Sequence, residues 1–276
     1  MARLHLLLAA LVIGVLGTGL GVMQARATDP VPTLPAVAAP TPVPAPARTT
    51  AKPVTVRPRP VVRFPASLAA GWGIDVSWPQ CGARLPAVAT GFAIVGVNGG
   101  RPMTGNPCLR DQLSALRGHL PVAFYLNLAA PSSGDPAAYG ARIVDDGLAR
   151  IARTGAHVPV VWLDVEILNA WRDRSTNVAV INAALRRLTA RGLTGGIYSS
   201  VPMWQQVTGG AAIHVPVWLA ITGSEVPSLR QACATGLGGT KATMVQYVAI
   251  TPAQKLVDAD VLCRTDAGVL KFFGRL

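Results

Sequence analysis

Two carboxylates close a strongly apolar stretch of the sequence, and they are the residues best suited to chemistry. The stretch runs from Val158 to Glu166 (VPVVWLDVE) and carries Asp164 and Glu166 at its end. Its apolar and β-branched residues predict a buried strand, in which residues i and i+2 point to the same face. We therefore expect both acidic side chains to project side by side into one space.

A pair of adjacent carboxyl groups favours acid catalysis. Repulsion and partial burial raise the pKa of one carboxyl, which then holds a proton near neutral pH while its partner stays charged. Glycoside hydrolysis uses this division of roles, because one carboxyl protonates the leaving oxygen and the other stabilises the cationic sugar or activates its attacker. The pair therefore predicts a glycan-cleaving site.

The elements that would position this pair alternate between short apolar segments and helical patterns. We predict strands at residues 72–78, 92–98, 121–127, 158–166, 195–199, 216–221, 243–248 and 259–262. Helices are expected at 109–116, 136–154, 177–191, with Ser175 as N-cap, and around 203–207. This order is typical of an α/β fold, a parallel (β/α)8 barrel of the TIM type. A doubly wound open sheet is the less favoured alternative, since no glycine-rich nucleotide fingerprint follows the first strand.

In such barrels the site lies where the strands end. Residues 66–276 contain 12 acidic residues, and five of them fall at expected strand ends, namely Asp75, Asp164, Glu166, Asp258 and Asp260. Amide and aromatic side chains near other strand ends would suit the acetamido groups, hydroxyl groups and ring faces of sugars. We expect these substrate-binding residues to be Asn98, Asn127, Tyr198, Trp218, Gln246 and Tyr247, together with Asp260.

The rest of the sequence indicates an exported, tethered domain. Residues 1–27 have a basic start, an apolar core and an Ala-Arg-Ala end, which predicts a signal peptide or a retained membrane anchor. Residues 28–65 contain 11 of the 23 prolines, which predicts a semi-rigid linker. The domain, residues 66–276, has 18 Lys and Arg residues against 12 acids and no long basic run, so no nucleic-acid partner is expected. We expect it to be a monomer.

Four cysteines lie in this exported domain, and an oxidising compartment favours disulfides between them. Three pairings are possible. We favour Cys81–Cys108 and Cys233–Cys263, because each of these pairs closes the shorter loop. No close Cys or His spacing indicates a metal site, and no cofactor is expected.

Several segments resemble glycoside hydrolase family 25, the muramidase-type lysozymes. They are GIDVSWPQ (residues 73–80), VVWLDVE (160–166), GIYSS (196–200), PVWLA (216–220) and QY…VDADV (246–261). The resemblance implies a barrel that cleaves peptidoglycan between N-acetylmuramic acid and N-acetylglucosamine. By position it implies that Glu166 is the general acid, Asp164 its partner, and Asp75 and Asp258 further catalytic residues, with Tyr198 lining the cleft.

The chain departs from the family pattern in its second strand (AIVGVNGG) and its third (FYLNLA), so it resembles a divergent member, similar to domains of secreted actinobacterial proteins. One alternative is therefore a glycan-binding or scaffold module of the cell envelope with weak or no activity. A chitinase- or deacetylase-like enzyme is a further alternative. It is disfavoured because the fourth strand lacks the longer chitinase motif, and His157 and His214 precede strands at the wrong barrel end.

Overall fold

The computed structural model describes residues 71–83, 85, 91–116, 120–157, 159–221, 228–250, 256–265 and 272–273. The expectations for the leader, residues 1–27, and for the proline-rich segment, residues 28–65, lie outside these ranges. No helix in the described ranges is long and apolar enough to cross a membrane.

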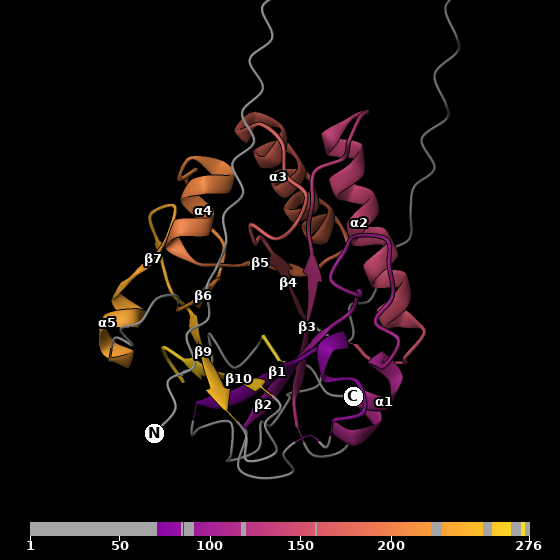
Figure 1. Cartoon of the computed structure of the whole chain (residues 1–276), viewed down its shortest axis with the longest axis vertical. Helices are drawn as coiled ribbons and strands as arrows, with labels where there is room; N and C mark the ends of the chain where they lie inside the picture. The colour runs from indigo at the N-terminus through magenta and orange to yellow at the C-terminus, as the bar shows by residue number, and fades with distance from the viewer. Residues whose placement is uncertain are drawn as a thin grey trace, which may run out of the picture. The chain divides into compact units, whose positions relative to one another are not determined.

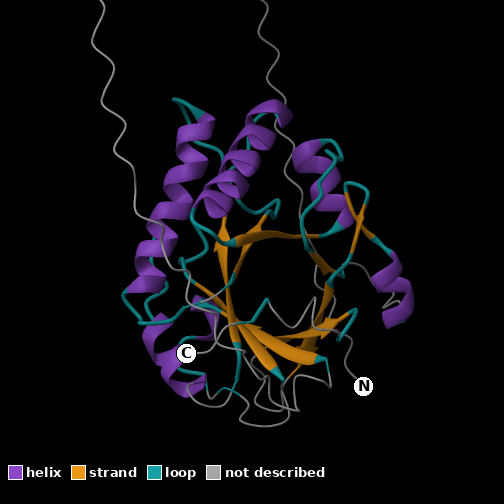
Figure 2. Ribbon diagram, turned by 180° about the vertical axis from the view of Figure 1, so that it is seen from behind, coloured by secondary structure: helices purple, strands orange, loops and turns teal. Residues whose placement is uncertain are grey.

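Eight strands close into a barrel, which confirms the predicted fold class (Figures 1 and 2). Their order around the barrel is β1-β10-β9-β6-β5-β4-β3-β2. The strands are β1 (Trp72–Val76), β2 (Phe92–Gly96), β3 (Val122–Asn127), β4 (Val160–Asp164), β5 (Thr194–Ser199), β6 (Val217–Ala220), β9 (Met244–Ile250) and β10 (Leu256–Leu262). The short pair β7 (Gly236–Leu237) and β8 (Thr240–Lys241) forms a separate hairpin.

The last barrel strand corrects the expectation of a fully parallel sheet. Strands β1 to β6 and β9 run parallel, but β10 is antiparallel to both of its neighbours, β9 and β1. Only five residues separate β9 from β10, and a parallel crossover needs a dozen or more. The chain therefore turns back on itself to close the barrel.

The helices lie outside the ring of strands, as Figure 2 shows. They are α1 (Leu109–Leu116), α2 (Pro136–Ala152), α3 (Arg174–Ala190), α4 (Val201–Thr208) and α5 (Leu229–Ala234), and a 3-10 helix, η2 (Trp78–Gln80), follows β1. Helix α3 starts three residues earlier than predicted, because Asp173 rather than Ser175 is its N-cap and accepts a hydrogen bond from the Thr176 N–H.

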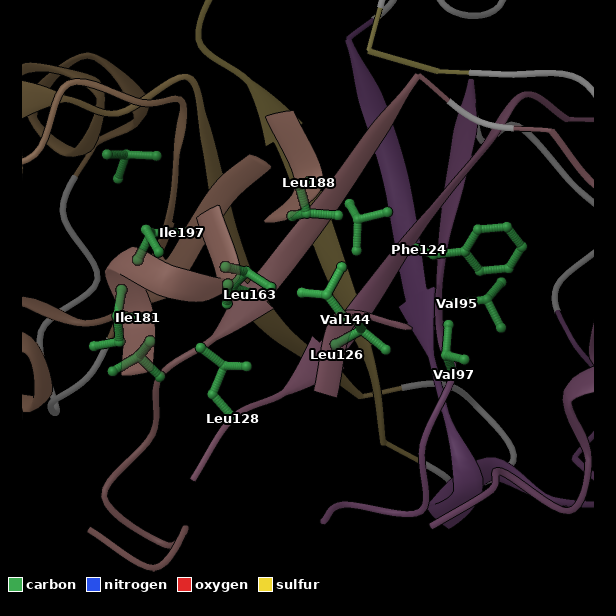
Figure 3. Packing of buried hydrophobic residues seen from close by; sticks show 14 of the residues in the cluster. Val95, Val97, Phe124, Leu126, Leu128, Val144, Leu163, Ile181, Leu188 and Ile197 are labelled. Atoms are coloured by element: carbon green, nitrogen blue, oxygen red, sulfur yellow. The ribbon is translucent and has the colours of Figure 1, made fainter. Parts of the chain in front are cut away.

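Alternation along the strands divides the core into two layers. One layer packs outward-facing strand residues such as Leu126 and Leu163 against Val144 of α2 and Ile181 of α3 (Figure 3). The other fills the barrel interior with Trp162, Trp218 and further large side chains, including Phe272 and Phe273 after β10. The inner layer carries the pocket described below.

Candidate active site

A pocket of about 160 Å³ lies at the mouth of the barrel, where the parallel strands end. Its walls come from residues on or next to η2 and seven of the strands. The lining residues are Asp75, Ser77, Pro79, Gln80, Tyr125, Asp164, Glu166, Tyr198, Trp218, Gln246 and Asp258. All four carboxyls that we expected to be catalytic therefore meet in one pocket.

One wall of the pocket is the end of β4. This strand stops at Asp164, so Glu166 lies two residues beyond it rather than within it, yet both side chains line the pocket. Asp164 is 3% exposed, whereas Glu166 is only partly buried. Asp164 Oδ1 is buried and has no hydrogen-bond partner within the described ranges, so it can accept a hydrogen bond from a ligand.

Two residues expected to bind substrate instead support Asp164 from behind. Asn127 donates through Nδ2 to Asp164 Oδ2. Asn98 bonds the backbone of Asn127 twice, since its Oδ1 accepts from the Asn127 N–H and its Nδ2 donates to the Asn127 carbonyl, each at 3.1 Å. Neither asparagine lines the pocket. The structure therefore does not support the prediction that Asn98 and Asn127 contact substrate, because their side-chain amides hydrogen-bond Asp164 and its neighbouring backbone instead.

The opposite wall is the seam where β1 meets β10. Register places Asp75 opposite Asp258, and Gly73 opposite Asp260. Because β10 runs antiparallel, its earlier acid, Asp258, lies at the mouth, while Asp260 lies one layer deeper and is fully buried. Asp260 was expected to bind substrate, but it lies beneath the pocket, where Oδ1 accepts from Trp218 Nε1 at 2.8 Å.

A chain of hydrogen bonds joins the two walls. Tyr198 Oη donates to Gln246 Oε1 at 2.7 Å, and Gln246 Nε2 donates to Asp75 Oδ2 at 2.8 Å. Tyr198 Oη also lies 3.5 Å from Glu166 Oε1. Both Tyr198 and Gln246 line the pocket as expected, and Trp218 forms part of its floor.

Burial sets the protonation of these carboxyls. It is the main cause that raises the pKa of Glu166 and of Asp258, and the charge of Asp258 raises the pKa of Glu166 further. Burial and the nearby Asp258 raise the pKa of Asp75 to about 8. Burial also holds the pKa values of Asp164 and Asp260 well above the usual range. The pocket can thus hold protons near neutral pH.

Asp75 is the carboxyl with the most hydrogen-bond support for a negative charge. Gln246 Nε2 donates a hydrogen bond to Asp75 Oδ2, and this bond lowers the pKa of Asp75 against the effect of burial. The neighbouring Asp260 also acts to lower the pKa of Asp75, while burial and the charge of Asp75 raise the pKa of Asp260. The pocket therefore combines a partly exposed Glu166, whose pKa is raised, with Asp75, which has a pKa of about 8 and a hydrogen bond from Gln246 that favours its ionised form.

Tyr247 corrects another expectation. It follows Gln246 directly in β9, and successive residues of a strand point to opposite faces. Gln246 faces the pocket, so Tyr247 faces outward, where it packs against the layer between strands and helices. Tyr247 accordingly does not line this pocket.

The lining residues Ser77, Pro79, Gln80 and Tyr125 were missed from the sequence. Strand alternation could have found two of them, because Ser77 follows Asp75 by two positions and Tyr125 precedes Asn127 by two. Gly96 of β2 lets them meet, since a Cβ there would lie 2.6 Å from Ser77 Cβ and 2.7 Å from Tyr125 Cζ. The departure of the second strand from the family pattern thus shapes the pocket.

Helix α1 and the segment before it hold the η2 wall in place. Gln112 Nε2 donates to the Ser77 carbonyl at 2.6 Å, and Gln112 Oε1 accepts from Asn106 Nδ2 at 2.8 Å. The structure also pairs Cys81, directly after η2, with Cys108. A second disulfide joins Cys233 to Cys263, so both pairs are those favoured from the sequence. Within the described ranges, no cluster of His, Cys, Asp and Glu fits a metal ion.

The chain is similar to a family of lysozyme-like proteins and to several solved structures. The family model of lysozyme-like protein 1 matches residues 92–230, half of the chain. No curated protein matches the sequence. Among solved structures, a glycosyl hydrolase 25 of Streptococcus pneumoniae, GHIP, has a TM-score of 0.52 at 18% identity over 75% of this chain and 95% of its own.

Two further structures share the fold. A family 25 glycosyl hydrolase from Bacillus anthracis has a TM-score of 0.52 at 14% identity, covering 74% of this chain and 93% of its own. The modular Cpl-1 endolysin of phage Cp-1, solved with a peptidoglycan analogue, has a TM-score of 0.50 at 18% identity and covers 71% and 54%. With the family match and the carboxyl pocket in hand, the chain belongs to the lysozyme-like family, and its barrel shares the fold of the family 25 glycosyl hydrolases.

Proposed function

We propose that this chain is an extracytoplasmic hydrolase of peptidoglycan that cleaves the bond between N-acetylmuramic acid and N-acetylglucosamine. The observation that carries the proposal is the convergence of Glu166, Asp164, Asp75 and Asp258 on one pocket in a lysozyme-like barrel. The structurally similar Cpl-1 endolysin was solved in complex with a peptidoglycan analogue. Residues 1–27 would export or anchor the domain, and residues 28–65 would separate it from the membrane.

Glu166 is the proposed proton donor. Its carboxyl is only partly buried and its pKa is raised, so it can hold a proton and still reach a ligand. Its proton passes to the glycosidic oxygen as the bond from that oxygen to the anomeric carbon breaks. The sugar departs as an alcohol, and the anomeric carbon carries the positive charge of an oxocarbenium-like state.

Asp75 and Asp164 are the proposed stabilisers of that charge. A positive charge forming in the pocket lowers the pKa values of nearby carboxyls and so favours their ionised forms. Asp75 is best prepared for this, because Gln246 already donates a hydrogen bond to it. Water then adds to the anomeric carbon, and its proton passes to a pocket carboxylate. The pocket is smaller than the roughly 300–1,000 Å³ of sites that enclose a drug-sized ligand, so a polymer would lie across its mouth.

Product analysis of purified peptidoglycan tests this proposal. The full chain, Glu166→Gln and the matched control Asp111→Asn would each be incubated with the polymer, reduced with borohydride and analysed by mass spectrometry. Asp111 is an exposed acid of α1 outside the pocket. We expect the wild type and Asp111→Asn to release reduced muramic-acid ends. Glu166→Gln should be slower by about 10²–10⁴-fold, the usual contribution of a general acid.

Two other outcomes would contradict the proposal in different ways. New ends at N-acetylglucosamine would keep the hydrolase and show that the proposed bond is wrong. If the wild type binds wall polymers but releases no reducing ends from them, the enzymatic proposal fails, and a glycan-binding module remains.

A further inference from the structure

A basic groove lies between the start of α1 and the end of α2, away from the carboxyl pocket. It consists of two adjoining hollows of about 190 Å³ each, which share Arg110, Arg153 and Thr154. One hollow also includes Arg150. No lining residue of this arginine groove belongs to the pocket that contains Glu166.

The groove carries more positive charge than its surroundings offset. Arg110 and Arg153 are exposed, and neither forms an ion pair within the part of the chain that the structure describes. Arg150 pairs with Asp146, at 2.8 Å from Nε to Oδ2. Of the three arginines, only Arg150 has a carboxylate partner in the described ranges.

Arg150 is held with one edge directed at the groove. Its Nε and Nη2 donate to Asp146, and Nη2 also lies 3.4 Å from the Met103 carbonyl. Its Nη1 lies 2.6 Å from where a Cβ would stand on Gly105, another lining residue. Because residue 105 is glycine, the guanidinium group can occupy this place, and a side chain there would displace it.

We propose that the arginine groove binds the phosphate groups of an anionic, phosphodiester-linked cell-wall polymer. Guanidinium groups match phosphate oxygens with paired hydrogen bonds, and a partner-bonded arginine such as Arg150 loses little entropy in doing so. Two hollows in tandem suit successive charges of a chain better than one free ion. The assignment to a wall polymer rests on the proposed function, whereas the affinity for phosphodiesters follows from the groove itself.

Calorimetric titration of the full chain with a glycerol phosphate oligomer tests the proposal, with inorganic phosphate as a separate arm. The double variant Arg110→Gln/Arg153→Gln removes two charges from the groove. The double variant Arg142→Gln/Arg230→Gln removes two exposed charges elsewhere. We expect the groove variant to bind the oligomer about tenfold more weakly, equivalent to about 1.4 kcal/mol, and the control to bind as the wild type does.

Salt dependence and a third variant sharpen the test. The slope of log affinity against log salt should become shallower by roughly 2 in the groove variant, since two fewer phosphates are neutralised. Gly105→Ala, which pushes Arg150 Nη1 aside, should weaken oligomer binding without changing net charge. Cleavage of short soluble muropeptides should stay unchanged in all three variants, which separates this proposal from the proposed function.

Three results would overturn the proposal. Equal loss in both double variants would show that only net charge matters. Inorganic phosphate binding as tightly as the oligomer would show a site for the free ion rather than for a polymer. Unchanged oligomer binding in the groove variant would show that the groove is not the binding site.

Discussion

The two walls of the pocket are built in opposite ways. On the β4 wall, Asp164 and Glu166 come from one short segment, and Glu166 stays partly exposed. On the seam wall, Asp75 and Asp258 come from two strands distant in sequence, and Asp75 is buried and hydrogen-bonded to Gln246. The proposed proton donor thus keeps contact with solvent, whereas the proposed charge-stabilising carboxyl lies where protein groups replace water.

Among the wall variants Asp75→Asn, Tyr198→Phe and Asp258→Asn, the first should lower kcat the most. The amide keeps the shape of the seam wall but cannot carry the negative charge that a cationic transition state needs. We expect kcat to fall by about 10²–10³-fold, as when one preorganised electrostatic group is removed. KM should change little. Steady-state rates on a soluble muropeptide would show this, and an unaltered kcat would mean that the seam wall has no electrostatic role.

The same variant should gain stability at alkaline pH. The folded pKa of Asp75 is about 8, above its ordinary value of 3.8, so the folded state binds more protons than the unfolded state between these values. This group's contribution therefore makes the free energy of unfolding fall as pH rises from about 4 to 8. An asparagine cannot ionise, so Tm measured across this range should decline less steeply in Asp75→Asn. A parallel decline in both proteins would contradict the raised pKa.

Tyr198→Phe should have a smaller effect, since it removes one link between the walls. The Tyr198 hydroxyl donates to Gln246, and its loss leaves that amide oxygen without this donor. We expect kcat to fall about tenfold and the free energy of unfolding to fall by about 1 kcal/mol. Tyr247→Phe, on the opposite face of β9, is the matched control and should keep wild-type kcat. Equal losses in both variants would contradict the assignment of faces.

Asp258→Asn should have the smallest effect, a shift in the pH profile. The charge of Asp258 contributes to the raised pKa of Glu166, so its removal lowers that pKa. Glu166 must be protonated to donate, and activity is lost as pH rises through its pKa. The alkaline limb of kcat/KM should therefore move to lower pH, by about one unit or less. If the alkaline limb stays at the same pH, a group other than Glu166 produces it.

Much of this arrangement could be predicted from sequence patterns, and the misses have physical causes. Apolar runs located the strands, and the i, i+2 rule placed Asp164 and Glu166 together because it depends on one strand alone. The depth of Asp260 could not be read in the same way, since it depends on the direction of β10 and on its register with β1. Asn98 and Asn127 lie behind the pocket wall rather than on it, because the end of a strand can support a wall without lining it.

Other misses came from choices between similar signals. Asp173 and Ser175 are both good N-caps, and the structure uses Asp173 because its carboxylate accepts from the Thr176 N–H. Tyr247 and Gln246 are neighbours in one strand, so they could not both face the pocket. That error was avoidable from the sequence, whereas the cap was not.

The reversed direction of β10 also decides what seals the other end of the barrel. A strand that starts at the mouth delivers the residues after it to the base, where Phe273 meets Phe92 with ring centroids 4.4 Å apart and Phe272 meets Trp162 at 6.3 Å. These two phenylalanines close the base of the barrel interior. A truncation just after β10 would therefore remove these two side chains from the base of the barrel. The loss would weaken the packing beneath the carboxyl pocket.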